Sequence, residues 1–145
     1  MKKHSLKDWL IAVRPWSFPA SAMPVIVTLA YLYWAYGVIE WANGLLGLVG
    51  IVIFHASGNA WSDYFDFERG VDRVDTFGVK TLTSGQFMPL EIRNLAIGLM
   101  VPAVMVGLWL VVRTGLPLFW IGVCGALCSL RYPWLKYRSF GDLVI

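Results

Sequence analysis

The chain alternates between long apolar segments and short polar links, and each apolar segment approaches the length of a membrane-spanning helix. The apolar segments cover residues 18–39, 44–62, 95–112 and 116–130, and the last is open to extension towards Trp134. A helix needs roughly 20 mostly apolar residues to cross a bilayer. These runs are too long and too continuous for the strands of a membrane barrel. We therefore expect an all-α transmembrane bundle with four spanning helices.

Two polar stretches interrupt this pattern. Residues 7–16, KDWLIAVRPW, mix basic and apolar side chains in a way that predicts a short amphipathic helix lying on the membrane surface. Residues 63–93 form the one long polar connection, whereas the links at 40–43 and 113–115 are brief. We expect a short interfacial helix followed by the bundle, with no domain boundary along the chain.

Composition supports a membrane protein, and the basic residues set its orientation. The chain is 58% hydrophobic and only 14% charged, whereas soluble domains carry about 25% charged residues. Of the 12 Lys and Arg residues, only Arg113 falls on the side opposite the N-terminal arm and the 63–93 connection. The positive-inside rule then places the N-terminus and this connection in the cytoplasm, in a bacterial-type inner membrane. Because topology explains the net charge of +3, no nucleic-acid partner is needed.

A polar stripe marks the end of the second apolar segment. His55, Asn59, Asp63 and Asp66 stand at positions i, i+4, i+8 and i+11, and Ser62 lies beside them. Residues at this spacing share one face of a helix. A carboxylate at the centre of a spanning helix costs about 2.5–3.5 kcal/mol on insertion scales, and less near the end. The stripe therefore requires a compensating cation or a basic partner.

Two interpretations of the acidic pair stay open on the residues alone. In the first, Asp63 and Asp66 mark the end of a spanning helix and meet water, paired with Arg69 or Arg73. In the second they hold Mg²⁺, which uses one or two carboxylates together with substrate phosphates and water. The position of the pair at the cytoplasmic mouth of a bundle favours the second interpretation.

Four stretches of the chain carry a resemblance to a known family. They are RPWSFPASAMPVI (14–26), GNAWSDYFDFERGVDR (58–73), KTLTSGQFMPLE (80–91) and LRYPWLKYRSFGDLVI (130–145). In this order and at these separations they resemble the N-terminal half of the UbiA superfamily of intramembrane prenyltransferases. The similarity is closest to the 1,4-dihydroxy-2-naphthoate prenyltransferases of menaquinone synthesis. It covers nearly the whole chain.

The resemblance implies a site and a reaction. A fold of about nine helices would bind a polyprenyl diphosphate through Mg²⁺, and the prenyl group would pass to an aromatic acceptor. The acids Asp63 and Asp66 match the family's first motif, although Ser62 replaces the Asn that usually precedes the first acid. The resemblance then implies catalytic residues Asp63 and Asp66, metal ligands Asp63, Asp66 and Asn59, and substrate-binding residues Asn59, Arg14, Lys80, Arg73, Asp72, Tyr132 and His55.

The same resemblance implies that the chain is part of a larger unit. The family carries a second acidic motif in its later half, and the chain stops at FGDLVI, where the fifth helix would start. We expect residues 1–145 to be the N-terminal half, inactive without the C-terminal half or an equivalent chain. The alternative is a small non-catalytic four-helix membrane protein that binds a divalent cation or a lipid diphosphate, or pairs with a second chain. Homogentisate and 4-hydroxybenzoate are among the alternative acceptors.

Overall fold

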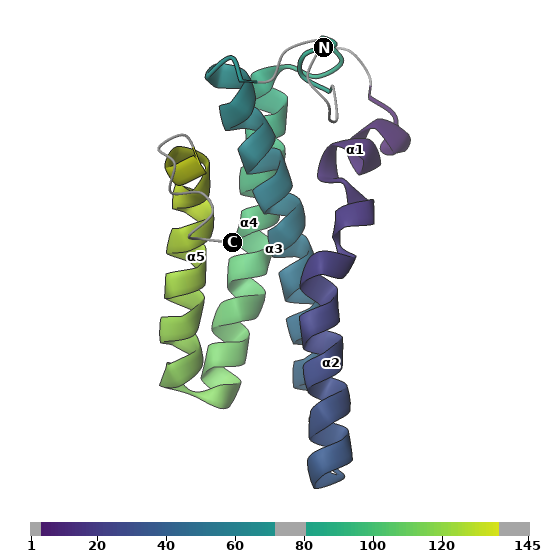
Figure 1. Ribbon diagram of the computed structural model, residues 1–145, viewed down its shortest axis with the longest axis vertical. Coiled ribbons are helices and arrows are strands. Elements are labelled where there is room, and N and C mark those ends of the chain that lie inside the picture. The colour runs from purple at the N-terminus through teal and green to yellow at the C-terminus, as the bar shows by residue number, and fades with distance from the viewer. Residues whose placement is uncertain (1–3, 72–80, 137–145) are drawn as a thin grey trace.

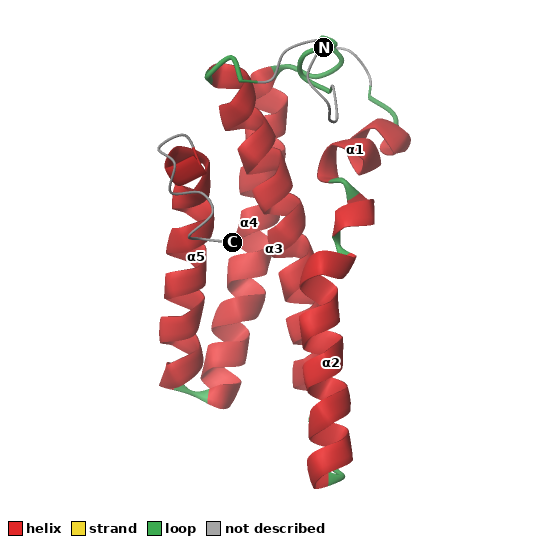
Figure 2. Ribbon diagram, viewed as in Figure 1, coloured by secondary structure: helices red, strands yellow, loops and turns green. Residues whose placement is uncertain are grey.

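The computed structural model describes residues 4–71 and 81–136, with side chains as far as Tyr132, and every regular element in them is helical. Helices α1 (Leu6–Val13), η1 (Pro15–Ser17), α2 (Pro19–Tyr36), α3 (Trp41–Glu68), α4 (Pro89–Thr114) and α5 (Leu116–Lys136) follow in order. Figure 2 shows helices joined by short links, without strands in the described part. The prediction of an all-α bundle is confirmed.

The long helices stand side by side with α3 and α4 at the centre (Figure 1). α3 packs most extensively against α4, α2 runs along the lower half of α3, and α5 stands beside α4. The predicted amphipathic helix is α1, which sits near the upper end of α3. Its first turn is closed by a capping box in which the Ser5 side chain accepts from Asp8 N and Asp8 accepts from Ser5 N.

Two elements differ in length from the sequence prediction. α3 continues to Glu68 instead of ending near Ser62, and α4 begins at Pro89 instead of near Leu95. Hydropathy detects only the apolar part of a helix, whereas backbone hydrogen bonds carry the helix on into water. The predicted polar connection is therefore shorter than expected, and Asp63 and Asp66 lie within regular helix.

Length and apolarity identify the candidate membrane spans. α3 and α4 qualify individually, with mean hydropathies of 1.4 and 2.5. The segments Leu6–Ser17 and Pro19–Tyr36 together make a third candidate, bent by 53° where they meet. α5 is apolar but falls among the shorter helices over its described residues. By this measure residues 4–71 and 81–136 contain two spanning helices, or three if the bent pair is counted as one span, whereas the sequence predicted four.

The buried core lies towards one end of the bundle. It contains Ala12 of α1, Ala60 of α3, Leu82 and Phe87 before α4, and Ile92 of α4, with Ala96 completing the cluster. Farther along, Gly50 brings α3 close to Val106 of α4, since a Cβ at Gly50 would lie 2.9 Å from Val106 Cγ1. A buried bond from Ser57 Oγ to Ala96 O, 2.8 Å long, joins the same two helices.

The close approach at Gly50 predicts a position-specific cost. Gly50→Ala should destabilise the helix packing by about 1–3 kcal/mol, because the added methyl group displaces Val106. Gly47→Ala is the matched control on the same helix, since nothing lies within 4 Å of its new Cβ. SDS-titrated unfolding in mixed micelles measures both variants. Equal midpoints for Gly50→Ala and Gly47→Ala would contradict the predicted contact.

Candidate functional site

The acidic pair lies in the last turns of α3 and is buried. Asp63 is 3% exposed and Asp66 is 7% exposed. Ser62 Oγ donates to Asp66 Oδ2 at 3.4 Å, a long hydrogen bond. Asp63 is ion-paired with Arg14, which comes from the break between α1 and η1. Because both carboxylates are buried, neither simply meets water at the end of a helix, as the first interpretation assumed.

A cavity of about 560 Å³ opens beside the polar stripe of α3. Arg14, His55, Asn59, Ser62 and Asp66 line it, so the stripe and one basic residue face the same space. Three members of the predicted stripe of α3, His55, Asn59 and Asp66, thus line one space. Asp63 is not among the lining residues, and it adjoins the cavity through Arg14.

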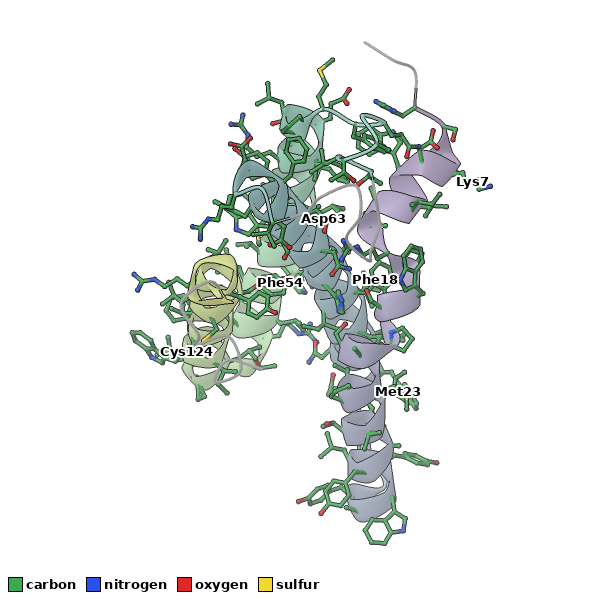
Figure 3. All side chains as sticks on the ribbon, turned by 45° about the horizontal axis from the view of Figure 1, so that its top comes forward. Lys7, Phe18, Met23, Phe54, Asp63 and Cys124 are labelled. Atoms are coloured by element: carbon green, nitrogen blue, oxygen red, sulfur yellow. The ribbon has the colours of Figure 1, made fainter. Side chains whose placement is uncertain are left out.

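The rest of the cavity wall comes mainly from α3 and α5, with Ser21 contributed by α2. Ile51 and Phe54 of α3 lie below the polar stripe, and Gly125, Cys128 and Tyr132 of α5 form the opposite wall. In Figure 3, Phe54 points towards α5, whereas Asp63 lies where α3 faces the segment that carries Phe18. A polar end with charges and an apolar remainder suits an amphiphilic ligand.

Arg14 has an unusual backbone conformation. Its φ of 55° and ψ of 62° are left-handed, and it is the one non-glycine residue with positive φ in the described part of the chain. This conformation costs about 1–2 kcal/mol for a residue with a Cβ. Glycine commonly takes such a position at a helix end. Here an arginine takes it, and its guanidinium reaches Asp63 while Nε finds no acceptor among the described residues.

Two further stripe residues bind the break between α1 and α2. Asn59 Nδ2 donates to Val13 O at 3.0 Å and to Ser17 Oγ at 2.9 Å. His55 Nε2 lies 3.1 Å from Ser17 Oγ, and His55 Nδ1 lies 2.8 Å from Ser21 Oγ. A backbone carbonyl only accepts, so the Asn59 atom facing Val13 O is the nitrogen. The Asn59 amide oxygen is then the atom left for a ligand.

These residues fit a hard divalent cation. Two carboxylates and an amide oxygen on one helix face are the donors that Mg²⁺ prefers. No group of three or more His, Cys, Asp or Glu side chains able to hold a metal occurs within residues 4–71 and 81–132. The described donors therefore amount to an incomplete shell for such an ion.

The remaining predicted residues divide into two groups. Tyr132 lines the cavity. Asp72, Arg73 and Lys80 lie outside the described residues. The expected turn at residues 83–86 is present, with Gly85 at φ 67°.

Sequence reasoning missed the serines that meet the stripe. Ser17 and Ser21 are spaced i, i+4 on the partner segment, which was a detectable signal. Pro15 and Pro19 flank Ser17, and a proline removes a backbone donor and disfavours helix at the preceding residue, so they indicated a break. The α5 lining at Gly125 and Cys128 carried no such signal, because it depends on how two distant helices pack.

Comparisons with known proteins identify the family. The model of the UbiA prenyltransferase family matches residues 21–145. The chain belongs to this family. It is 29% identical to UbiA prenyltransferase domain-containing protein 1 of Mus musculus, over 99% of this chain and 44% of that protein. It is 28% identical to the protein of that name from Homo sapiens, over 95% of this chain and 42% of that protein. The homolog from Drosophila melanogaster is 37% identical over 47% of this chain and 20% of that protein.

The extent of these matches limits what they establish. The chain spans less than half the length of the mouse and human relatives. No solved structure matches the chain significantly. Family membership is therefore what these matches establish for this chain.

The buried pair predicts an asymmetric response to mutation of this UbiA-family chain. Arg14→Gln should destabilise the protein by about 3–5 kcal/mol, because it removes the guanidinium that pairs with the nearly fully buried Asp63. Asp63→Asn should cost less, because Arg14 is 27% exposed and can turn towards the cavity. Thermal unfolding in detergent micelles compares the two variants.

Added Mg²⁺ supplies the second part of this test. It should restore stability to Arg14→Gln, whose acids persist, and not to Asp63→Asn. Arg113→Gln, an exposed change at the far end of α4, is the control. A uniform stabilisation of all three variants by Mg²⁺ would show that the ion acts elsewhere.

Proposed function

We propose that this chain supplies the first half of the active site of a Mg²⁺-dependent prenyltransferase. The enzyme transfers a polyprenyl group from polyprenyl diphosphate to an aromatic acceptor. The observation that carries the proposal is the placement of two buried carboxylates one turn apart on α3 in a chain of the UbiA family: Asp66 lines the cavity, and Asp63 pairs beside it with the lining residue Arg14.

The charges at the cavity support a divalent cation. Arg14 contributes one positive charge, and Asp63 and Asp66 contribute two negative charges, so these three groups sum to −1. A Mg²⁺ ion held by these carboxylates would offset this negative charge, and it would supply Lewis-acid assistance to the departure of a diphosphate.

The described residues would have separate roles in binding the ion, the diphosphate and the acceptor. Asp66 and the Asn59 amide oxygen face the cavity and would hold the ion, together with Asp63. Arg14 lines the cavity, where its positive charge would attract a diphosphate oxygen. The Tyr132 ring lines the α5 wall, where it would meet the aromatic acceptor or the allylic cation. Asp72, Arg73 and Lys80 complete the proposed diphosphate site from outside the described part of the chain.

The acceptor proposed is 1,4-dihydroxy-2-naphthoate, as in menaquinone biosynthesis. This choice rests on the subgroup that stretches such as 80–91 resemble. The site would face the cytoplasm of a bacterial-type cell membrane, since the basic residues gather at that end of the bundle. The relatives reported above are animal proteins, so the membrane side is proposed from the charge pattern alone.

Removal of either acid should abolish turnover. Membranes holding the chain, alone or joined to the later half of a family member, would receive Mg²⁺, farnesyl diphosphate and dihydroxynaphthoate. We expect product only from the joined protein, and its loss by about 100-fold or more in Asp63→Ala and Asp66→Ala. Glu68→Ala is the matched control, because this acid lies on the same helix but is exposed.

The outcomes of this assay separate the candidate functions. Unchanged turnover in Asp66→Ala would contradict the assigned site. Mg²⁺-dependent binding of farnesyl diphosphate by the chain, without turnover in any joined protein, would favour the non-catalytic binding protein.

Cysteine labelling tests the proposed orientation. In a background with Cys124 and Cys128 replaced by Ala, we expect Ser84→Cys to react with an impermeant maleimide from the cytoplasmic side only. Thr114→Cys, at the other end of α4, should react from the opposite side only. Both positions are exposed. Labelling of both from one side would rule out the proposed topology.

A further inference from the structure

The break between α1 and α2 leaves a backbone carbonyl group that needs a hydrogen-bond donor, and α3 supplies one. A helix that ends leaves carbonyl groups without partners in its own helix, and lipid supplies none. Val13 O is such a group, whereas Arg14 O already accepts from the backbone N–H of Ser17 at 2.9 Å. Asn59 of α3 donates to Val13 O, and Ser17 Oγ donates to Arg14 O at 2.8 Å. The polar stripe therefore caps the end of α1.

Ser17 is the hub of this arrangement, and its single proton fixes the rest. Because that proton goes to Arg14 O, the Ser17 oxygen must accept from its other two partners. Those partners are Asn59 Nδ2 and His55 Nε2. We therefore expect His55 Nε2 to carry a proton.

The other ring nitrogen of His55 then accepts. In a neutral imidazole with Nε2 protonated, Nδ1 is an acceptor. Ser21 Oγ lies 2.8 Å from Nδ1, closer than its alternative acceptor Phe18 O at 3.2 Å. The Ser21 proton therefore goes to His55. Both nitrogens of His55 are committed to serines one turn apart on the broken segment.

This commitment changes the role expected for His55. Although His55 lines the cavity, it has no nitrogen left to bind a substrate or to take a proton from an acceptor. Its ring instead connects α3 to both sides of Phe18, at Ser17 and Ser21. Between them, His55 and Asn59 define where the chain turns, and Arg14 sits at that turn.

We propose that His55 is a positioning residue that acts through Ser17 and Ser21 to hold the α1–α2 break, and thereby the left-handed backbone of Arg14 and its contact with Asp63. The proposal rests on the proposed function for its kinetic consequence, and on geometry alone for its structural one. His55 contributes no acid–base step and touches no substrate.

The structural consequence is testable by ¹⁵N-histidine NMR of the chain in lipid nanodiscs. The chain has two histidines, so His4→Gln leaves His55 as the only signal. We expect a protonated Nε2 and an unprotonated Nδ1 at neutral pH, and a shift of the Nε2 signal in Ser17→Ala. Thr28→Val is the control, because the Thr28 hydroxyl bonds only to Pro24 O of its own helix. A protonated Nδ1 with a bare Nε2, or no response to Ser17→Ala, would overturn the network.

The kinetic consequence is testable by a double-mutant cycle in the joined enzyme. His55→Leu should lower kcat/KM about 10–100-fold, as loss of a supporting partner does. His55→Gln should recover most of the activity, since an amide can donate to Ser17 and accept from Ser21. In an Arg14→Ala background, His55→Leu should add less than about three-fold, because its effect passes through Arg14. If the fold-losses in kcat/KM of the two single variants multiply in the double variant, His55 acts independently of Arg14, and the proposal is overturned.

The positioning role of His55 and the proposed prenyltransferase function can be contradicted separately. If Asp66→Ala leaves turnover intact, the catalytic assignment is wrong, and the NMR signal still decides whether His55 holds the break. If the acids are essential and the tautomer is the opposite one, the prenyltransferase assignment stands and the positioning role is wrong.

Discussion

The contact between Arg14 and Asp63 is the constraint around which the described site is built. Asp63 is almost fully buried near the end of a spanning helix, where an isolated carboxylate is expensive. Its cationic partner comes from a residue 49 positions earlier in the chain. To bring that guanidinium to α3, the chain must stop its first helix at Arg14 and accept a left-handed backbone there. The break, the bend and the strained residue follow from one electrostatic requirement.

The same face of α3 that requires the break also stabilises it. A helix interrupted in an apolar environment exposes carbonyl groups, and the stripe meets them with the Asn59 amide and, through Ser17, with the His55 ring. One periodic row of side chains thus supplies the acids and the donors that hold their counter-charge in place. Such agreement between local and tertiary requirements is expected of a sequence that specifies one structure.

Local periodicity explains what could be predicted from the sequence. The helices over the apolar segments and the polar stripe of α3 depend on spacings within one helix. The structure has helices over all four segments, and it places His55, Asn59 and Asp66 of the stripe at one cavity. The extension of α3 to Glu68 was missed because hydropathy identifies only the apolar part of a helix and does not detect a polar end. The partners of Asp63 and His55 were missed because they lie 49 and 38 residues away. Contacts at such separations depend on how helices pack, which no single-sequence spacing encodes.

The buried core lies at the end of the bundle that carries the Arg14–Asp63 contact. Apolar side chains in mid-membrane can face lipid at little cost, so burying them there contributes little free energy. The buried cluster instead gathers where α1 meets α3 and the start of α4, around Ala12, Ala60 and Phe87. Polar links from Gln86 to Asp8 and from His4 to Glu91 fasten the same end. Rigidity is concentrated where Arg14 has to be held against Asp63, because a charged site works only if its groups are already in position when a ligand arrives.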